Sequence, residues 1–337
     1  MDSSRAPAKH SVLVIGCGSI GERHLRCFLS TQRVAAAVCD TNATLLAEVA
    51  QRYEVPGFAS LDAAQAGFPA TAWIICTPAH THLPLALRAL KGGMGVLIEK
   101  PLSVSLNGVA EVQAQLQSTR LHGAVAYVYH VIPWIHEVRA ALLAGEIGTP
   151  KLASVVAGQH FPTFRPAYRD IYYAHHATGG GAIQDALTHL ANVIEWLLGP
   201  TTRLFCDAAH QVLEGVHVED TVNIVARQGS VMTSYSLNQF QAPDEVVIQI
   251  HGTLGSIKIE SHNQLWGLMR HGDAGWTWHQ TEPLARDTHF VRQADEFLNG
   301  IEGRPSLLAT FDEGARTLKF NLAALESART GKQIDIA

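Results

Sequence analysis

The 337-residue sequence predicts an α/β fold, with a doubly wound parallel sheet followed by an α+β domain that has an open, mainly antiparallel sheet. Three observations predict it. Short, continuously apolar strands alternate with helices over the first 130 residues, which is typical of a parallel sheet covered on both faces. A glycine-rich loop joins the first strand to the first helix. After about Val131 the pattern changes to helices and successive strand-like stretches.

A chain of this length exceeds what one hydrophobic core usually serves, so we expect two domains, 1–130 and 131–337. In the first domain, apolar strand-like runs alternate with helical stretches. The expected strands are Ser11–Ile15, Val34–Cys39, Ala72–Cys76, Val96–Glu99 and Ala124–Tyr129, and the expected helices are Ser19–Leu29, Leu45–Tyr53, His82–Lys91 and Leu106–Ser118.

The second domain begins with helices and continues with strands. The expected helices are Trp134–Ala144 and Ala182–Leu198, and the expected strands are Lys151–Gly158, Arg203–Ala208, Asp220–Arg227, Val231–Asn238, Val246–His251 and Ser256–Glu260. Gln228-Gly229-Ser230 is a plausible hairpin connection. Two final helices, Phe290–Leu298 and Asp312–Thr330, are candidates for packing back on the first domain.

Composition excludes several classes of protein. The formal charge is −5 without a basic block, which argues against a nucleic-acid partner. No uncharged apolar run approaches the roughly 18 residues that a membrane helix needs, and the first ten residues lack a secretory signal. The five cysteines form no paired motif, which indicates reduced thiols and no metal cluster. We expect a cytoplasmic protein without membrane association.

The glycine loop matches the dinucleotide-binding pattern G-x-G-x-x-G through Gly16, Gly18 and Gly21, with Ser19 and Ile20 opening the helix. Such glycines permit a tight turn and close approach of a pyrophosphate, whose charge the helix N-terminus favours. Asp40 follows the second strand, where a carboxylate would accept hydrogen bonds from the adenosine ribose and repel a 2′-phosphate. The sequence therefore favours NAD over NADP. The alternatives are a glycine turn without ligand and an Asp40 that only caps the next helix.

Two further features are candidates for chemistry. Lys100 ends the fourth strand, and ligands of such sheets bind beyond the carboxyl ends of strands. In the helix Ala182–Leu198, Asp185 and His189 are four residues apart and share a face with Asn192, on a helix that is otherwise apolar. The alternatives are a surface lysine, an exposed Asp–His pair, and a metal site for which no third ligand is evident.

These residues suit hydride chemistry. Oxidation of a secondary alcohol needs a base for the hydroxyl proton, and an imidazole titrates near physiological pH, which favours His189. Asp185 could orient that imidazole or bind the substrate, and Lys100 could stabilise the developing alkoxide.

At these residues the sequence resembles the Gfo/Idh/MocA oxidoreductases, a family that includes glucose–fructose oxidoreductase and inositol dehydrogenase. The resemblance covers nearly the whole chain. Its motifs are the glycine loop, Cys76-Thr77-Pro78 with His82, Glu99-Lys100-Pro101, Gly145-Glu146-Ile147-Gly148, Gly179-Gly180-Gly181 with Asp185 and His189, 251–256 and 326–332. It implies a Rossmann domain, Thr77, Pro78, His82 and Glu99 around the cofactor, and Lys100, Asp185 and His189 as the catalytic trio. It also implies a homodimer or homotetramer formed through the C-terminal sheet, and substrates such as sugars and inositols.

Several positions depart from the family pattern and put inherited substrate contacts in doubt. Ala79 follows the Thr-Pro pair where Asn is frequent, Asn192 replaces a frequent Asp, and Val128-Tyr129-His130 replaces Asn-x-Arg. The segment 159–178 is expected near the pocket mouth, with Arg165 and Tyr172 as candidate substrate contacts together with Asn192. The alternative is that its Arg and Tyr side chains meet a partner subunit.

The leading hypothesis is hydride transfer between NAD(H) and a secondary hydroxyl of a sugar, cyclitol or sugar acid. The same residues would serve an NAD-dependent glycosidase that oxidises, eliminates and reduces, or the reduction of a linear keto acid. A non-catalytic regulator that senses NAD is a further alternative, against which Lys100, Asp185 and His189 speak.

Overall fold

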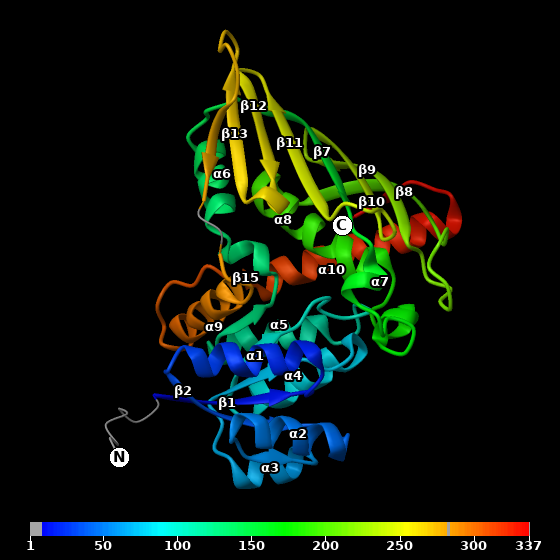
Figure 1. The fold of residues 1–337 in the computed structure, drawn as a ribbon. Helices are drawn as coiled ribbons and strands as arrows, with labels where there is room; N and C mark the ends of the chain where they lie inside the picture. The colour runs from blue at the N-terminus through cyan, green and yellow to red at the C-terminus, as the bar shows by residue number, and fades with distance from the viewer. Residues whose placement is uncertain (1–8, 282–283, 337) are drawn as a thin grey trace. The chain divides into compact units, whose positions relative to one another are not determined.

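The computed structural model describes residues 9–281 and 284–336; residues 1–8, most of the segment inspected for a secretory signal, lie outside them. The chain divides into two compact units. The first comprises 1–128 and 285–312, and the second comprises 129–284 and 313–337. Each is described by itself below, and Figure 1 shows their elements.

The first unit is built on a seven-stranded sheet with the order β15-β6-β5-β4-β1-β2-β3. All neighbours are parallel except β15, which pairs antiparallel with β6. The strands are β1 (His10–Ile15), β2 (Val34–Cys39), β3 (Gly57–Phe58), β4 (Ala72–Ile75), β5 (Gly95–Ile98), β6 (Gly123–Val125) and β15 (Ala309–Thr310). The predicted doubly wound parallel sheet is confirmed, because its central strands are buried along their whole length.

Six helices of the first unit follow from local signals and from packing. They are α1 (Ser19–Ser30), α2 (Ala43–Tyr53), α3 (Leu61–Gly67), α4 (His82–Lys91), α5 (Val109–Thr119) and α9 (Thr288–Ile301). Asn42 and Ser60 cap α2 and α3 by accepting main-chain N–H bonds. Helix α9 packs on α1, where the rings of Phe28 and Phe297 meet edge to face at 6.0 Å and Arg26 forms an ion pair with Asp287.

The second unit contains a nine-stranded sheet with the order β14-β13-β12-β11-β7-β10-β9-β8-β16. Its strands are β7 (Pro150–Gly158), β8 (Thr201–Ala209), β9 (Thr221–Gln228), β10 (Val231–Asn238), β11 (Glu245–Gly252), β12 (Gly255–Glu260), β13 (Leu265–Arg270), β14 (Thr277–Gln280) and β16 (Ile334–Asp335). Only the β7–β10 pair is parallel, so the predicted mainly antiparallel sheet is confirmed. Gln228 pairs with Val231, which confirms the two-residue hairpin connection.

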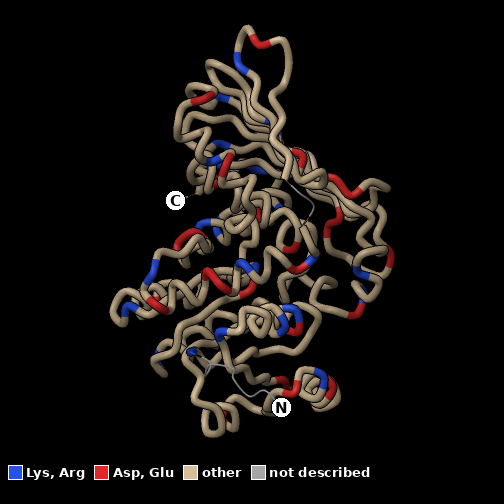
Figure 2. The backbone as a smooth tube through the Cα atoms, turned by 60° about the vertical axis from the view of Figure 1, so that its left-hand side comes forward, with Lys and Arg blue, Asp and Glu red and all other residues tan. Residues whose placement is uncertain are grey.

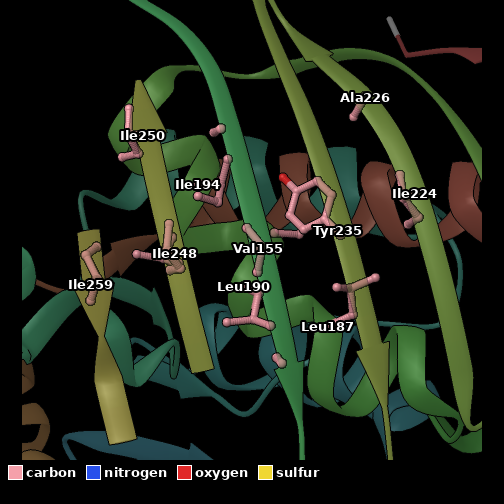
Figure 3. Close-up of a cluster of buried hydrophobic side chains, with 14 of the residues drawn as sticks. Val155, Leu187, Leu190, Ile194, Ile224, Ala226, Tyr235, Ile248, Ile250 and Ile259 are labelled. Atoms are coloured by element: carbon pink, nitrogen blue, oxygen red, sulfur yellow. The ribbon is translucent and has the colours of Figure 1, made fainter. Parts of the chain in front are cut away.

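One face of this sheet is covered by α6 (Pro133–Leu143), α8 (Thr188–Leu198) and α10 (Phe311–Thr330) (Figure 1). Figure 3 shows Leu187, Leu190 and Ile194 directed at strand residues such as Val155 and Ile248, all of them nearly inaccessible to solvent. Burial of such side chains contributes about 1.5–3 kcal/mol each, so this contact fixes the helix that carries the candidate catalytic residues.

The opposite face of the same strands is exposed and carries large apolar side chains among polar ones. Side chains alternate along each strand, so the neighbours of the core residues point outward. The outward set includes Leu152 and Val156 on β7, Phe205 on β8, Val225 on β9 and Met232 on β10, each between 40% and 60% exposed. We call these five residues the open face.

Charged positions of both signs are interspersed along the described chain (Figure 2). No helix in the described part of the chain is long and apolar enough to cross a membrane. Some elements differ from the prediction. The expected strand Ala124–Tyr129 ends at Val125, and the β13–β14 hairpin, with Trp266 stacked on His279 at 4.3 Å, was not expected.

Candidate active site

The glycine loop connects β1 to α1 and can be built only with glycine at two of its positions. Gly16 has φ +92°, and a Cβ there would lie 2.7 Å from the carbonyl oxygen of Cys76. A Cβ on Gly21 would lie 1.8 Å from the carbonyl oxygen of Gly16. By contrast, a Cβ on Gly18 would meet nothing within 4 Å, and no described side chain caps the start of α1 at Ser19 and Ile20. The loop therefore presents an open helix N-terminus, which fits a pyrophosphate.

Asp40, at the end of β2, is fixed beside this loop. Its Oδ2 accepts a 2.6 Å bond from the main-chain N–H of Cys17, and its Oδ1 accepts a 2.8 Å bond from the N–H of Asn42. A carboxylate has about four acceptor sites, so these bonds orient Asp40 and leave capacity for ribose hydroxyls. The donor and acceptor groups present here fit an adenosine ribose that carries no 2′-phosphate.

The loop after β4 is joined to the loop after β5 by His82. The buried imidazole faces the carbonyl oxygen of Thr77 from Nε2, at 2.7 Å, and that of Pro101 from Nδ1, at 3.0 Å. Thr77 also shares a 2.6 Å bond with the hydroxyl of Thr81, while Pro78 precedes the short helical turn Ala79–Thr81. Burial lowers the pKa of His82. His82 thus joins the backbone of Thr77 to that of Pro101 through two buried contacts.

Glu99 and Lys100 follow β5. The Glu99 carboxylate is buried, with Oε1 2.7 Å from Nε2 of His24 on α1 and Oε2 accepting a 3.0 Å bond from the main-chain N–H of Lys100. Lys100 is half-buried, and its peptide bond to Pro101 is cis. The pair Glu99–His24 therefore fixes the backbone of Lys100 relative to the helix that begins at the glycine loop.

In the second unit, Asp185 lies in a π-helical turn, Ile183–Leu187 (η5), that leads into α8. The sequence predicted one continuous α-helix here; single π turns of this kind occur frequently at functional sites. Asp185 is 8% exposed and accepts a 2.7 Å bond from the hydroxyl of Tyr172. His189 follows one turn later, half-buried, with its ring 6.3 Å from that of Tyr129. The structure thus brings Asp185 together with Tyr172, one of the expected substrate contacts.

The glycine triplet before this turn is explained by two close approaches. A Cβ on Gly180 would lie 2.1 Å from the carbonyl oxygen of Tyr173. Gly181 has φ +89°, and a Cβ there would lie 2.6 Å from Oε1 of Glu219. That carboxylate accepts a 2.8 Å bond from the main-chain N–H of Ile183, so Glu219 caps the helix that carries Asp185.

Two other expected substrate contacts lie in different surroundings. Arg165 is exposed and donates to the carbonyl oxygen of Phe164. Asn192 is 2% exposed and donates a 3.0 Å bond to Thr317, whose hydroxyl donates to Glu195. This buried network links Asn192 on α8 to α10, and its role as a substrate contact stays a prediction.

Sequence reasoning did not single out Glu219 or His24. The sequence carries no spacing signal for them, because each acts through a contact with a residue far away in the chain. Within residues 9–281 and 284–336, no three His, Cys, Asp or Glu side chains gather in a way that could hold a metal ion.

Comparison with known proteins identifies the family to which the chain is related. Residues 10–130 match the GFO/IDH/MocA oxidoreductase family, NAD-binding Rossmann fold, and residues 135–258 match a GFO/IDH/MocA C-terminal domain. Inositol 2-dehydrogenase of Rhizobium meliloti (strain 1021) is 23% identical over 341 residues, covering 96% of this chain and 98% of that protein.

Two solved structures share the fold. Levoglucosan dehydrogenase in complex with NADH and levoglucosan has a TM-score of 0.87 at 19% identity, covering 97% of this chain and 99% of that one. The WlbA dehydrogenase from Bordetella pertussis, in complex with NADH and UDP-GlcNAcA, has a TM-score of 0.83 at 22% identity, covering 98% and 99%. With both halves matched, the chain belongs to the Gfo/Idh/MocA oxidoreductases, a family of NAD-dependent sugar and cyclitol dehydrogenases.

Proposed function

We propose that the protein transfers a hydride between NAD(H) and a secondary hydroxyl or keto group of a sugar, cyclitol or sugar acid. The observation that carries the proposal is the carboxylate of Asp40, fixed on the N–H of Cys17 within the open glycine loop. The relatives named above support the substrate class, since they are described as acting on inositol or as holding NADH together with a sugar or a sugar nucleotide.

We propose NAD as the cofactor, held by the glycine loop and by Asp40. When bound, NAD supplies the site that accepts the hydride. The N-terminus of α1 favours the negative pyrophosphate, and Asp40 favours ribose hydroxyls over a 2′-phosphate. Thr77 and Pro78 are proposed to border the cofactor, while His82 and Glu99 brace the loops around it.

Lys100, Asp185 and His189 are proposed as the catalytic residues. The imidazole of His189 takes the proton of the substrate hydroxyl, and the ammonium of Lys100 stabilises the negative charge that develops on that oxygen. The carboxylate of Asp185, oriented by Tyr172, binds a substrate hydroxyl. Tyr172 and the exposed Arg165 are proposed as further substrate contacts, with Arg165 suited to a carboxylate or phosphate group.

The test is NADH formation with purified protein over a panel of sugars, cyclitols and sugar acids. His189→Ala and Lys100→Ala should each reduce kcat by about 100-fold or more while NAD still binds. Near-native turnover by both variants would refute the assigned roles. Release of an aglycone without accumulation of NADH would instead identify a glycosidase.

We also propose that the protein forms a homodimer or homotetramer through the open face. Five large apolar side chains exposed on one side of a sheet favour a protein interface there. Val156, Val225 and Met232 lie on three adjoining strands, with polar residues such as Ser234 and Ser236 paired beside them. A surface of this mixed composition suits an interface that is the same on both partners.

A further inference from the structure

The segment 172–178 and the first turn of the catalytic helix are joined by several bonds. Tyr172 donates to Asp185 at 2.7 Å, and Nε2 of Gln184 donates to the carbonyl oxygen of His176 at 3.1 Å. The main-chain N–H of Gly180 donates to the carbonyl oxygen of His175 at 2.9 Å. A change in the position of this segment therefore changes the position of the Tyr172 hydroxyl.

A further link between segment 172–178 and the start of the helix joins two ionisable side chains, His176 and Glu219. Nε2 of His176 lies 2.5 Å from Oε2 of Glu219, while Oε1 of the same carboxylate accepts the N–H of Ile183. The main-chain carbonyl of Glu219 also accepts the N–H of Ala182 at 2.9 Å. Glu219 thus holds the helix start with one oxygen and the Tyr172 segment with the other. Its carboxylate is buried, whereas the His176 side chain is 47% exposed and can exchange its proton with solvent.

Building on the proposed function, we propose that His176 and Glu219 form a proton-dependent latch that positions Tyr172 on Asp185 for substrate binding. With His176 protonated, the charge-assisted bond to Glu219 holds segment 172–178 against the helix start. When the proton leaves, the ion pair is lost and the Tyr172 hydroxyl is less well fixed on the Asp185 carboxylate. His176 and Glu219 are positioning residues, since they act through Tyr172.

The groups around His176 favour its protonated form. Its hydrogen bond to Glu219 raises the pKa of His176 above the usual 6.5, although burial opposes the shift. Glu219 contacts His176 from the residues before β9, Gln184 in η5 donates to the His176 carbonyl oxygen, and Asp185 in the same turn accepts from Tyr172. On its own segment, Tyr173 has a raised pKa because of burial and the charges of Asp185, Glu219 and Asp220. Glu219 is therefore the anion in direct contact with His176.

The test is the pH dependence of kcat and KM for a substrate found in the panel. We expect the KM of the wild type to increase as the pH is raised above the pKa of His176. This change is separate from the loss of activity at low pH that protonation of a base such as His189 gives. His176→Gln should raise KM about tenfold at neutral pH, change kcat less than about threefold, and remove that alkaline rise. Glu219→Gln keeps an acceptor for Ile183 and should move the rise to lower pH. The matched control His175→Gln, an exposed histidine on the same segment, should behave as the wild type.

A double variant distinguishes a latch from general loosening. If His176 acts through Tyr172, His176→Gln should add nothing to the KM of Tyr172→Phe. Additive effects, or an unchanged pH profile in Glu219→Gln, would overturn the proposal.

A second readout needs no turnover and separates this proposal from the proposed function. Amide hydrogen exchange of residues 172–185, corrected for intrinsic pH dependence, should accelerate above the His176 pKa in the wild type and in His175→Gln, but not in His176→Gln. Equal exchange in all three proteins at every pH refutes the latch even if the enzyme proves to be a dehydrogenase. The predicted pattern in a protein inactive on the whole panel would support the latch and refute the proposed function alone.

Discussion

His122 should make the stability of the first unit depend on pH. It precedes β6 and packs on α9, with its ring 5.3 Å from that of Phe297 and against the backbone of Gly300. Its Nε2 is buried without a hydrogen-bond partner among the described residues. A proton added to the ring would therefore place a charge where no group compensates it, and burial lowers the pKa of His122 from 6.5 to about 4.

The sign and size of the effect follow from these two values. Above about pH 7.5 neither the folded nor the unfolded chain protonates this ring, so it adds no pH dependence. As pH falls from about 6.5 to about 4, the unfolded chain binds a proton that the folded chain does not, and the free energy of unfolding decreases. A difference of about 2.5 pH units corresponds to about 3 kcal/mol.

The perturbation is His122→Phe, which keeps a flat ring against Phe297 and Gly300 but cannot bind a proton. Urea unfolding at a series of pH values, together with hydrogen exchange of β6 and α9, would measure the stability of this unit. We expect the variant to lose about 3 kcal/mol less than the wild type between pH 7 and pH 4. His80→Gln, at an exposed histidine, is the control and should follow the wild type. A variant whose acid limb matches that of the wild type would refute the reasoning.

Three further predictions concern cofactor, loop and assembly. Asp40→Ser should lower kcat/KM with NAD about tenfold or more. It should also lower the ratio of kcat/KM with NAD to kcat/KM with NADP, measured by initial rates with both cofactors. Gly21→Ala should abolish NAD binding in calorimetry or destabilise the first unit in thermal unfolding, because its methyl group collides with the Gly16 carbonyl. Val225→Asp on the open face should shift the protein toward the monomer in light scattering, whereas Thr202→Asp, outside the open face near one end of β8, should leave the mass unchanged.

The first sheet was predictable because its signals are local. A strand buried on both faces is apolar throughout, and each helix follows within a few residues, so β2 and α4 have the predicted bounds. The assignment of α9 and β15 to the first unit depends on pairs such as Arg26 with Asp287 and Ala309 with Val125, which the linear order of the sequence does not relate. Short elements such as β3 and α3 were missed because two or seven residues give too little periodicity.

The residues of the candidate site likewise include some that the sequence could predict and others that it could not. Gly16, Asp40, Lys100, Asp185 and His189 stand at element ends or at helical spacing, and each could be chosen from residue type and position. The groups that hold them could not, since Glu99 is held by His24, which lies on α1 and is far away in the sequence. The hydrogen bond from Asn192 to Thr317 on α10 could not be predicted either, because the two residues are far apart in the sequence.

The glycine triplet shows what the sequence motif leaves out. From the sequence, Gly179-Gly180-Gly181 is a marker that precedes Asp185 and His189. In the structure, Gly181 is required because Glu219 must approach the helix start closely enough to accept the N–H of Ile183, and Gly180 is required because the carbonyl of Tyr173 lies against it. A side chain at either position would separate the Tyr172 segment from the helix that carries Asp185. The triplet therefore allows the buried Glu219 carboxylate to reach both the start of the helix and the His176 imidazole.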